Sequence, residues 1–378
     1  MGQSSAQLKW VWQQPKWPAF TWSERTLSPL LMRARRAQGE VLGRSKLLDA
    51  SLDLSAQAEI LTLDGINTSA IEGETIELPS LRSSIARRLG LPNAGMRVAP
   101  RHVDGLVEVL LDATQKHDNP LTFKRLCAWQ AALFPTGRSG LHEIRVGKLR
   151  GNAPMRIVSG AIGREKVHYE APPHAGLKLQ ATKFLQWFNE PPARLDGLLR
   201  AGIAHLWFEL LHPFEDGNGR VGRALMDMAI AQDESREMRL YSLSSQFMQH
   251  RDDYYSALAK VSVESLNITP WLAWFLQQVA DAAHDSEATI AHVLTKARFW
   301  MRHAQSHLNV RQRKALNRML DVGPDGFEGG MTNRKYRHLT GASAATAQRD
   351  LAELVANECL RVVNAGRSSQ YEVNIQRS

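Results

Sequence analysis

Cysteine is nearly absent from this chain, which has only Cys127 and Cys359 among its 378 residues. Two cysteines so far apart in sequence exclude a disulfide framework and any zinc module built on clustered cysteines. Thiols stay reduced in the cytosol, so we expect a cytoplasmic protein. The sequence also lacks any run that approaches the ~18 apolar residues of a membrane-spanning helix, so we expect no membrane partner.

Positive charge is in modest excess, because the chain has 47 Lys and Arg and 38 Asp and Glu, which gives a net charge of +9. A basic surplus of this size suits a nucleotide, a nucleic acid or an acidic partner without choosing among them. With 43% apolar and 22% charged residues, the composition is typical of a folded globular protein. At roughly 150 residues per domain, the length predicts two to three domains. We place them at residues 1–85, 86–285 and 300–378.

The first region, residues 1–85, is rich in aromatic side chains near its start. Its four tryptophans are Trp10, Trp12, Trp17 and Trp22. A segment with so many rings is not expected to be a solvated tail. Either the rings pack onto the main body, or they form a contact surface for a second subunit, since aromatic residues are enriched at interfaces. The second alternative fits a homodimer, which is the oligomeric state we expect.

The middle region is mostly helical by its pattern. Apolar residues recur at steps of three and four over residues 181–189, 196–211 and 221–232, which predicts α-helices. The exception is residues 155–172, where β-branched and aromatic residues surround Ser159-Gly160 and Gly163 and predict a short β-hairpin. The fold class is therefore mainly α, with one short hairpin before the helix at 181–189.

The most informative stretch is residues 212–223, which read His-Pro-Phe-Glu-Asp-Gly-Asn-Gly-Arg-Val-Gly-Arg. Apolar stripes on both sides predict a tight connection between two buried helices, the second of which begins near Arg220. The glycines let a ligand approach the main chain, and the N-terminus of the second helix favours an anion. Arg220 and Arg223 lie on nearly the same face of that helix, so both could contact phosphate oxygens.

The same stretch contains a base and a metal ligand. Asp216 supplies a hard oxygen of the kind that binds Mg²⁺ between phosphates. His212 titrates near neutral pH and can accept a proton from a hydroxyl. A calcium loop is excluded, because Arg220 stands where an oxygen ligand is needed and no glutamate closes the loop. A base, a carboxylate and an anion cradle so close together indicate phosphoryl or nucleotidyl transfer.

These residues match the signature of the Fic family, His-Pro-Phe-x-Asp-Gly-Asn-Gly-Arg-x-x-Arg, without a departure, and the chain resembles that family over roughly residues 55–285. The resemblance implies a helical Fic core whose hairpin at 155–172 is a flap that holds a target by strand addition. It also implies transfer of AMP from ATP to a Ser, Thr or Tyr hydroxyl of a target protein, self-modification included. ATP would be the substrate and Mg²⁺ the cofactor.

The resemblance assigns roles to the polar residues of the signature. His212 would take the proton from the target hydroxyl, and Asp216 would bind Mg²⁺ on the α- and β-phosphates. Arg220 would contact the β-phosphate and Arg223 the γ-phosphate. Tyr255, in a helix after the signature, would line the adenine site.

The remaining residues of the nucleotide-binding loop would act mainly through their main chain. They are Gly217, Asn218, Gly219, Val221 and Gly222. Of these, Asn218 would add a side-chain donor for the nucleotide.

A second motif lies upstream, where Thr68-Ser69-Ala70-Ile71-Glu72-Gly73 fits the inhibitory pattern of the family. The resemblance implies an N-terminal inhibitory helix whose Glu72 pairs with Arg223 and excludes the γ-phosphate. ATP could then bind only with its α-phosphate out of line for attack. Two alternatives stay open: Glu72 merely ends its helix, or it aligns a water that removes AMP from a modified protein.

The last region, residues 300–378, has its own pattern and a net charge of +5 over residues 301–378, from 12 Lys and Arg against 7 Asp and Glu. Helices are predicted at 311–320, 332–340 and 343–357, and strands at 360–363 and 370–373. This order resembles a winged helix-turn-helix, in which the helix at 343–351 would be the recognition helix.

Several side chains of this module are placed to contact DNA. The recognition helix would present Ser343, Thr346, Gln348 and Arg349 to a groove or to solvent, and Arg367 on the wing tip at 365–369 could reach a phosphate. Two alternatives follow. The chain could be a DNA-binding regulator whose Fic core senses nucleotide, or the module could serve protein contacts only.

Overall fold

The computed structural model describes residues 10–45, 50–91, 98–159, 166–237, 239–263, 265–320, 327, 329–364 and 369–375. The chain divides into two compact units. The first consists of Met1–Asp49 with Gln57–Ser286, and the second of Ala50–Ala56 with Glu287–Ser378. Within the described ranges, no helix combines the length and the apolar character that a membrane span requires.

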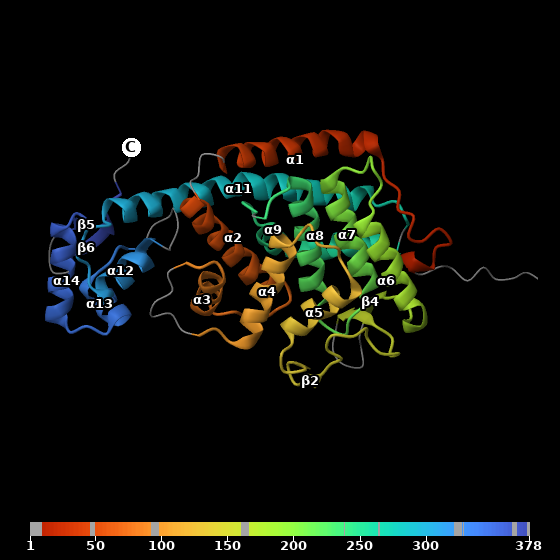
Figure 1. Cartoon of the computed structure of the whole chain (residues 1–378), viewed down its shortest axis with the longest axis horizontal. Helices are drawn as coiled ribbons and strands as arrows, with labels where there is room; N and C mark the ends of the chain where they lie inside the picture. The colour runs from red at the N-terminus through yellow and green to blue at the C-terminus, as the bar shows by residue number, and fades with distance from the viewer. Residues whose placement is uncertain are drawn as a thin grey trace, which may run out of the picture. The chain divides into compact units, whose positions relative to one another are not determined.

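The first unit is built almost entirely of helices (Figure 1). In chain order they are η1 (Val11–Gln13), α1 (Glu24–Ser45), α2 (Ala50–Ile71), α3 (Leu78–Arg88), α4 (Arg101–Gln115), α5 (Phe123–Leu133), α6 (His174–Asn189), α7 (Gly197–Leu211), α8 (Asn218–Glu234), α9 (Leu243–Gln249), α10 (Arg251–Val263) and α11 (Thr269–Arg302). Of these, α2 and α11 include residues of both units. The helices predicted at 181–189, 196–211 and 221–232 are confirmed as α6, α7 and α8.

Helices α7 and α8 pack side by side in the centre of the first unit (Figure 1). Both are buried on nearly every face, as Leu206 on α7 and Leu225 on α8, each 0% exposed, illustrate. Asp196 caps the N-terminus of α7, because its carboxylate accepts a hydrogen bond from the Leu198 N–H at 2.8 Å. Because both helices are enclosed, the turn that joins them is held from both sides, and its polar residues are fixed against the core.

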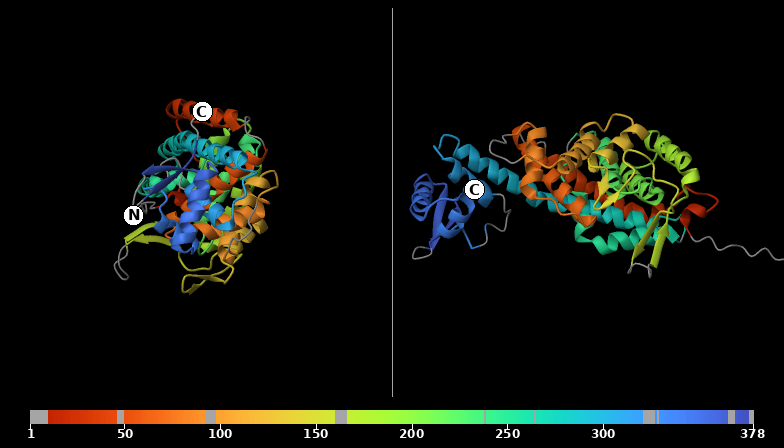
Figure 2. Two further views of the ribbon diagram at one scale, coloured as in Figure 1. Left: turned by 90° about the vertical axis from the view of Figure 1, so that its left-hand side faces the viewer. Right: turned by 90° about the horizontal axis from the view of Figure 1, so that it is seen from below.

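Two short hairpins complete the first unit: β1 (Arg138–Ser139) pairs with β2 (His142–Glu143), and β3 (Arg156–Ser159) pairs with β4 (Lys166–Glu170), both antiparallel. The β3–β4 hairpin projects from the helices (Figure 2, yellow-green). The hairpin predicted at 155–172 is therefore confirmed, although its tip, residues 160–165, lies outside the described residues. At its base, the Tyr169 hydroxyl donates to the Leu210 carbonyl at 2.6 Å, which ties β4 to the end of α7.

The N-terminal tryptophans pack onto the first unit. Trp10 is 6% exposed and meets the ring of Tyr169 edge-on. Trp12 donates from its indole to a main-chain carbonyl at the end of β4 at 2.7 Å, and Trp17 donates to a side chain of α6 at 3.0 Å. The first of the two alternatives for this segment is confirmed, and the homodimer stays a prediction.

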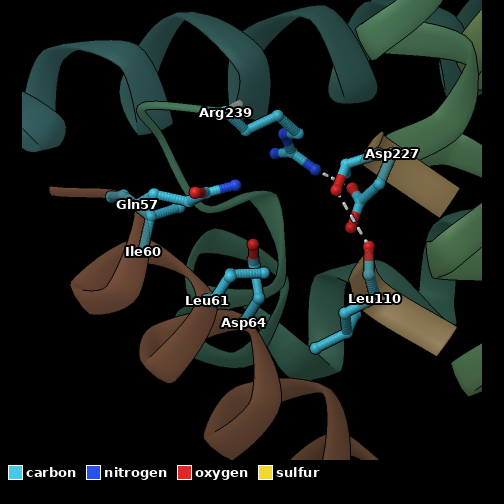
Figure 3. A pocket seen from close by; sticks show the side chains of 8 residues that line it. Gln57, Ile60, Leu61, Asp64, Leu110, Asp227 and Arg239 are labelled. Atoms are coloured by element: carbon cyan, nitrogen blue, oxygen red, sulfur yellow. Dashed lines mark hydrogen bonds and ion pairs between the residues drawn. The ribbon is translucent and has the colours of Figure 1, made fainter. Parts of the chain in front are cut away.

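A buried polar cluster joins α2 to α8 and to the segment that follows α8 (Figure 3). Asp227 of α8 pairs with Arg239, and the two side chains are 2% and 3% exposed. Asp64 of α2 accepts a hydrogen bond from the Ser242 hydroxyl at 2.5 Å, and burial raises the pKa of Asp64. The position of α2, and therefore of Glu72 just after it, is set by contacts inside the core.

Besides its parts of α2 and α11, the second unit contains three helices and a hairpin in its described part: α12 (Val310–Leu320), α13 (Asn333–Thr340), α14 (Ala344–Ala356), β5 (Leu360–Asn364) and β6 (Gln370–Val373). The helices and strands predicted for this region are confirmed. Its core includes Leu316, Tyr336 and Leu351. The Asp350 carboxylate accepts hydrogen bonds from the Tyr336 hydroxyl at 2.9 Å and from Arg311 Nε at 2.8 Å, which fixes α14 against α12 and α13.

The predicted outer face of α14 is exposed, as expected for Gln348 and Arg349. Ser343 instead caps α14, because its hydroxyl accepts a hydrogen bond from the Thr346 N–H at 3.2 Å. Arg367 and the wing tip at 365–368 lie outside the described residues.

Candidate active site

The turn between α7 and α8 is shorter than the sequence pattern indicates. Helix α8 begins at Asn218, so the predicted start near Arg220 is wrong by two residues. Gly217 precedes the helix with φ +85, and a Cβ there would lie 2.8 Å from the Phe134 ring, which leaves glycine as the residue that fits. The N–H groups of Asn218 and Gly219 therefore belong to the first helical turn, where they have no intrahelical acceptor. N–H groups at a helix N-terminus are suited to bind an anion.

Asn218 uses its side chain to brace this turn. Its Oδ1 accepts a hydrogen bond from the Phe214 N–H at 2.9 Å, and its Nδ2 donates to the Phe214 carbonyl at 2.9 Å. The residue is 2% exposed. One of the two N–H donors of its amide is therefore used within the turn, and its contribution of a donor to the nucleotide stays a prediction.

His212 ends α7 in a left-handed conformation with φ 47. Its Nδ1 lies 3.3 Å from the main-chain oxygen of Glu209. With the Nδ1 proton donated there, Nε2 remains as the proton acceptor. Burial is the main cause that lowers the pKa of His212 below its usual value, with Arg150 acting in the same direction, while the Glu209 carbonyl, Glu72 and Asp216 oppose the shift. The ring is therefore neutral at pH 7, as a general base must be.

The pair predicted between Glu72 and Arg223 is present. Glu72 Oε1 lies 2.6 Å from Arg223 Nη2, and the arginine side chain is 1% exposed. The same guanidinium donates from Nε to the Thr68 hydroxyl at 2.7 Å and from Nη2 to the Thr68 carbonyl at 2.9 Å. Although burial opposes it, Glu72 raises the pKa of Arg223, which stays charged. Within the described ranges, nothing accepts a hydrogen bond from its buried Nη1.

Arg220 is also paired, with a carboxylate that we did not predict from the sequence. Its Nη1 lies 2.6 Å from Glu74 Oε2, and its side chain is 6% exposed. Its guanidinium stacks over the Phe134 ring, 5.0 Å from the centroid. The sequence contained a signal for this pair, because Glu74 follows the motif residue Glu72 by two positions. The segment leaves α2 through Gly73, which has φ +79. Both arginines of the signature are thus paired with carboxylates of one short segment.

A cavity of about 670 Å³ opens beside the turn, within the size range of small-molecule sites. Its lining includes Glu72, Ile157, His168, Tyr169, Glu209, His212, Asp216, Gly219, Arg251 and Tyr255. Tyr255 is 39% exposed and donates to the Ile71 carbonyl at 3.2 Å, whereas its neighbour Tyr254 is buried and bonds to His205 at 2.9 Å. Of these two tyrosines, Tyr255 therefore has the larger exposed surface available to a ligand.

Asp216 lies on the wall of the cavity and is oriented by two donors. Its Oδ1 accepts a hydrogen bond from the Gly217 N–H at 2.5 Å, and its Oδ2 accepts one from the Ser139 hydroxyl. Three or more metal-binding side chains do not cluster anywhere in the described part of the chain. Mg²⁺ is commonly held by one or two carboxylates together with substrate phosphates and waters. The Asp216 carboxylate at this turn therefore fits an ion that arrives with a nucleotide.

Glu209 is a second acidic group that the sequence pattern did not reveal. It lies on α7 one turn before His212, and its Oε2 is 3.9 Å from His212 Nδ1. Burial, together with the nearby charge of Glu72, raises the pKa of Glu209 to about 8, while Arg223 opposes the rise. At pH 7 the carboxyl is therefore mostly protonated, and it adds little negative charge to a cavity that already contains Glu72 and Asp216.

Two family models match the chain. Residues 120–230 match the Fic/DOC family, and this range contains the whole turn from His212 to Arg223. Residues 10–91 match a second model, described as a domain of unknown function (DUF4172). That second range covers the tryptophan-rich start and the segment with Glu72 and Glu74, so the paired carboxylates lie outside the matched Fic/DOC range.

Relatives of the Fic/DOC domain are named as protein adenylyltransferases. The chain is 27% identical over 173 residues to Protein adenylyltransferase fic-1 of Caenorhabditis briggsae, which covers 43% of this chain and 30% of that protein. It is 28% identical over 220 residues to Protein adenylyltransferase Fic of Aedes aegypti, covering 57% of this chain and 40% of that protein. The chain thus spans well under half the length of these relatives.

The fold is similar to that of a solved structure over nearly the whole chain. A Fic family protein from Desulfovibrio desulfuricans G20 superposes with a TM-score of 0.52 at 19% identity, covering 93% of this chain and 97% of that one. At this level of identity the likeness concerns the fold alone.

Proposed function

We propose that this protein transfers AMP from ATP to a hydroxyl side chain of a protein. The observation that carries the proposal is the turn from His212 to Arg223, in which a neutral imidazole and a helix N-terminus border one cavity. The named activity of the relatives supports the same chemistry. A pure nucleotide sensor needs no base, so the presence of His212 favours an enzyme over a DNA-binding regulator.

In the proposed reaction, His212 Nε2 accepts the proton of the target hydroxyl. The hydroxyl oxygen forms a bond to the α-phosphorus of ATP, the bond from that phosphorus to the bridging oxygen breaks, and pyrophosphate leaves. Arg220 would hold the β-phosphate and Arg223 the γ-phosphate through charge-assisted hydrogen bonds. Asp216 would hold Mg²⁺, which supplies positive charge against the phosphates when it is bound.

The adenine and the target would enter the same cavity from different sides. Tyr255 of α10 would line the adenine site, since its ring lies on the cavity wall. The β3–β4 hairpin contributes Ile157, which is 44% exposed and lines the cavity as well. A target segment could add to the hairpin as an extended strand, which would bring its hydroxyl to the base. Because main-chain bonds dominate such binding, the hairpin does not name the target.

The proposed enzyme is restrained by the segment after α2. Glu72 accepts a hydrogen bond from the Arg223 guanidinium that the γ-phosphate would otherwise accept. Glu74 likewise binds Arg220, which would otherwise contact the β-phosphate. Two carboxylates in the phosphate site also repel an incoming polyanion. The resting state described here is therefore proposed to be inhibited, and activity should require this segment to move or to change.

The position of the label in ATP tests the proposed reaction. With Mg²⁺, the Glu72→Gly variant, which lacks the proposed restraint, or its target should acquire radioactivity from ATP labelled in the α-phosphate and none from ATP labelled in the γ-phosphate, because AMP carries only the α-phosphate. Gel autoradiography measures both. Label from the γ-phosphate would instead indicate phosphate transfer. A protein that only removes label from AMP-modified substrate would support hydrolysis with Glu72, and no label change in any of these assays would contradict the proposal.

For the second unit we propose a winged helix that contacts DNA through α14. The exposed Gln348 and Arg349 and the adjacent β5–β6 hairpin support this assignment. The double substitution Gln348→Ala with Arg349→Ala should weaken duplex binding about tenfold or more in a gel shift at low salt. Arg156→Ala, which removes the same charge from the first unit, should leave binding unchanged. Binding that is absent at low salt, or insensitive to salt, would favour protein contacts.

A further inference from the structure

Arg150 contacts both sides of the proposed active site. It lies in the segment between β2 and β3 and is 2% exposed. Its Nε donates to the carbonyl of His212 at 2.8 Å, and its backbone N–H donates to the carbonyl of Pro213 at 2.9 Å. Its Nη2 donates to the carbonyl of Pro172, just beyond the end of β4. One side chain therefore joins the turn that contains the base to the hairpin proposed to hold the target.

The conformation of His212 explains why its carbonyl needs such a partner. His212 is one of three non-glycine residues with positive φ in the described ranges, and that backbone geometry is unfavourable for an L-residue. It ends α7, where carbonyl groups lack intrahelical donors. The planar guanidinium of Arg150, with its fork of N–H donors, donates from one nitrogen to this carbonyl and from a second to the carbonyl of Pro172. A lysine ammonium cannot hold two donors in the same fixed geometry.

Within the described ranges, no carboxylate forms an ion pair with Arg150, and its side chain donates hydrogen bonds to main-chain oxygens. Burial without a counter-ion lowers the pKa of Arg150 from its usual value, so this position is unfavourable for a charge. The positive field that results acts on His212. It opposes Glu72, Asp216 and the main-chain carbonyl of Glu209, each of which favours the protonated ring.

We propose that Arg150 is a positioning residue that ties the His212 turn to the end of the β3–β4 hairpin and keeps the imidazole in its uncharged, proton-accepting form. This inference rests on the proposed function, because it assigns His212 the role of base. The Arg150 side chain makes two separate contributions to the site. The charge adds to the effect of burial on the protonation of His212, and the planar guanidinium sets the position of the hairpin relative to His212.

Three variants separate these contributions. Arg150→Met removes both the charge and the fork, whereas Arg150→Lys keeps the charge and loses the fork. Arg200→Met is the matched control, because Arg200 is another buried arginine of the first unit, 8% exposed, that donates to the Phe188 carbonyl at 2.7 Å. NMR titration of the histidine ring signals measures the pKa of His212 whether or not the protein transfers AMP. The titrations use the whole chain of 378 residues.

Arg150→Met should raise the pKa of His212 by about one unit, since removal of a nearby positive charge favours the imidazolium. Arg150→Lys and Arg200→Met should leave that pKa within a few tenths. In the activity assay, the pH at which kcat of Arg150→Met falls on the acid side of its pH profile should rise by the same amount. A shift in Arg150→Met no larger than in Arg200→Met would overturn the electrostatic part of the inference.

The hairpin provides the second readout. Arg150→Lys should raise KM for the target with a smaller change in kcat, and amide hydrogen exchange in β3 and β4 should be faster than in wild type. Exchange rates in β3 and β4 equal to those of wild type would overturn the tie to the hairpin. If Arg150→Met does not fold, Arg150→Gln, which shortens the fork and removes the charge, replaces it in the same titration. Absence of AMP transfer from Glu72→Gly as well as from wild type would contradict the proposed function and still leave the NMR and exchange results to decide the role of Arg150.

Discussion

Replacing Glu72 with glycine is expected to raise the initial rate of AMP incorporation by about 100-fold, the size of effect that misalignment of reacting groups can have. The change frees the buried Arg223 and removes a carboxylate from the site proposed for the γ-phosphate. The measurement is incorporation of label from ATP at several ATP and Mg²⁺ concentrations. Glu77→Gly is the control, because it removes a glutamate three residues after Glu74 whose carboxylate accepts a hydrogen bond from the Ser80 hydroxyl at 3.4 Å.

Arg223→Ala distinguishes release of the arginine from simple loss of the pair. It breaks the same contact with Glu72, yet it should not activate, because the γ-phosphate then lacks its partner. The double variant with Glu72→Gly should therefore resemble the Arg223 single variant, a non-additivity expected of residues in contact. If Glu72→Gly only lowers stability and shows no gain in rate, Glu72 merely ends α2 and the inhibitory assignment is wrong.

Glu74 adds a further step to the same series. In Glu72→Gly the pair between Glu74 and Arg220 remains, so the β-phosphate should still compete with a carboxylate. Adding Glu74→Gln should lower KM for ATP below that of Glu72→Gly alone. An unchanged KM would mean that Glu74 leaves Arg220 freely when ATP binds.

Replacing His212 with alanine is expected to reduce AMP transfer by about 10²- to 10⁴-fold, the usual contribution of a general base. The loss is best measured in the Glu72→Gly background, where the rate is highest. ATP affinity by calorimetry should stay close to that of the parent, because the proposed phosphate contacts are Arg220, Arg223 and the start of α8.

The control for this prediction is His168→Ala. His168 belongs to β4 and lines the same cavity, but it lies outside the turn between α7 and α8. It should retain far more of the transfer rate than His212→Ala. Near-normal transfer by His212→Ala would remove this histidine from the mechanism, and a parallel loss of ATP affinity would indicate that the turn had collapsed.

The sequence determined the parts of this protein whose geometry is local. A turn between two buried helices places neighbouring residues together whatever the rest of the chain does, so His212, Asp216 and the two arginines could be recognised from their spacing alone. The same holds for the periodic helices α6, α7 and α8 and for the hairpin at 155–172. Even here the early start of α8 and the bonding of Asn218 escaped notice, because both depend on how the turn packs against Phe134 and the core.

The tertiary structure decided which distant groups meet. Arg220 and Glu74 are 146 positions apart, and Arg150 reaches a carbonyl 62 positions away at His212. These contacts depend on how α2 packs on α8 and how the segment before β3 crosses the turn, and no local pattern contains that information. The burial of a side chain is also decided by the tertiary structure. Glu209 is a plain glutamate in the sequence, and only its enclosure beside Glu72 raises its pKa to about 8, because desolvation is a property of the surroundings and not of the residue.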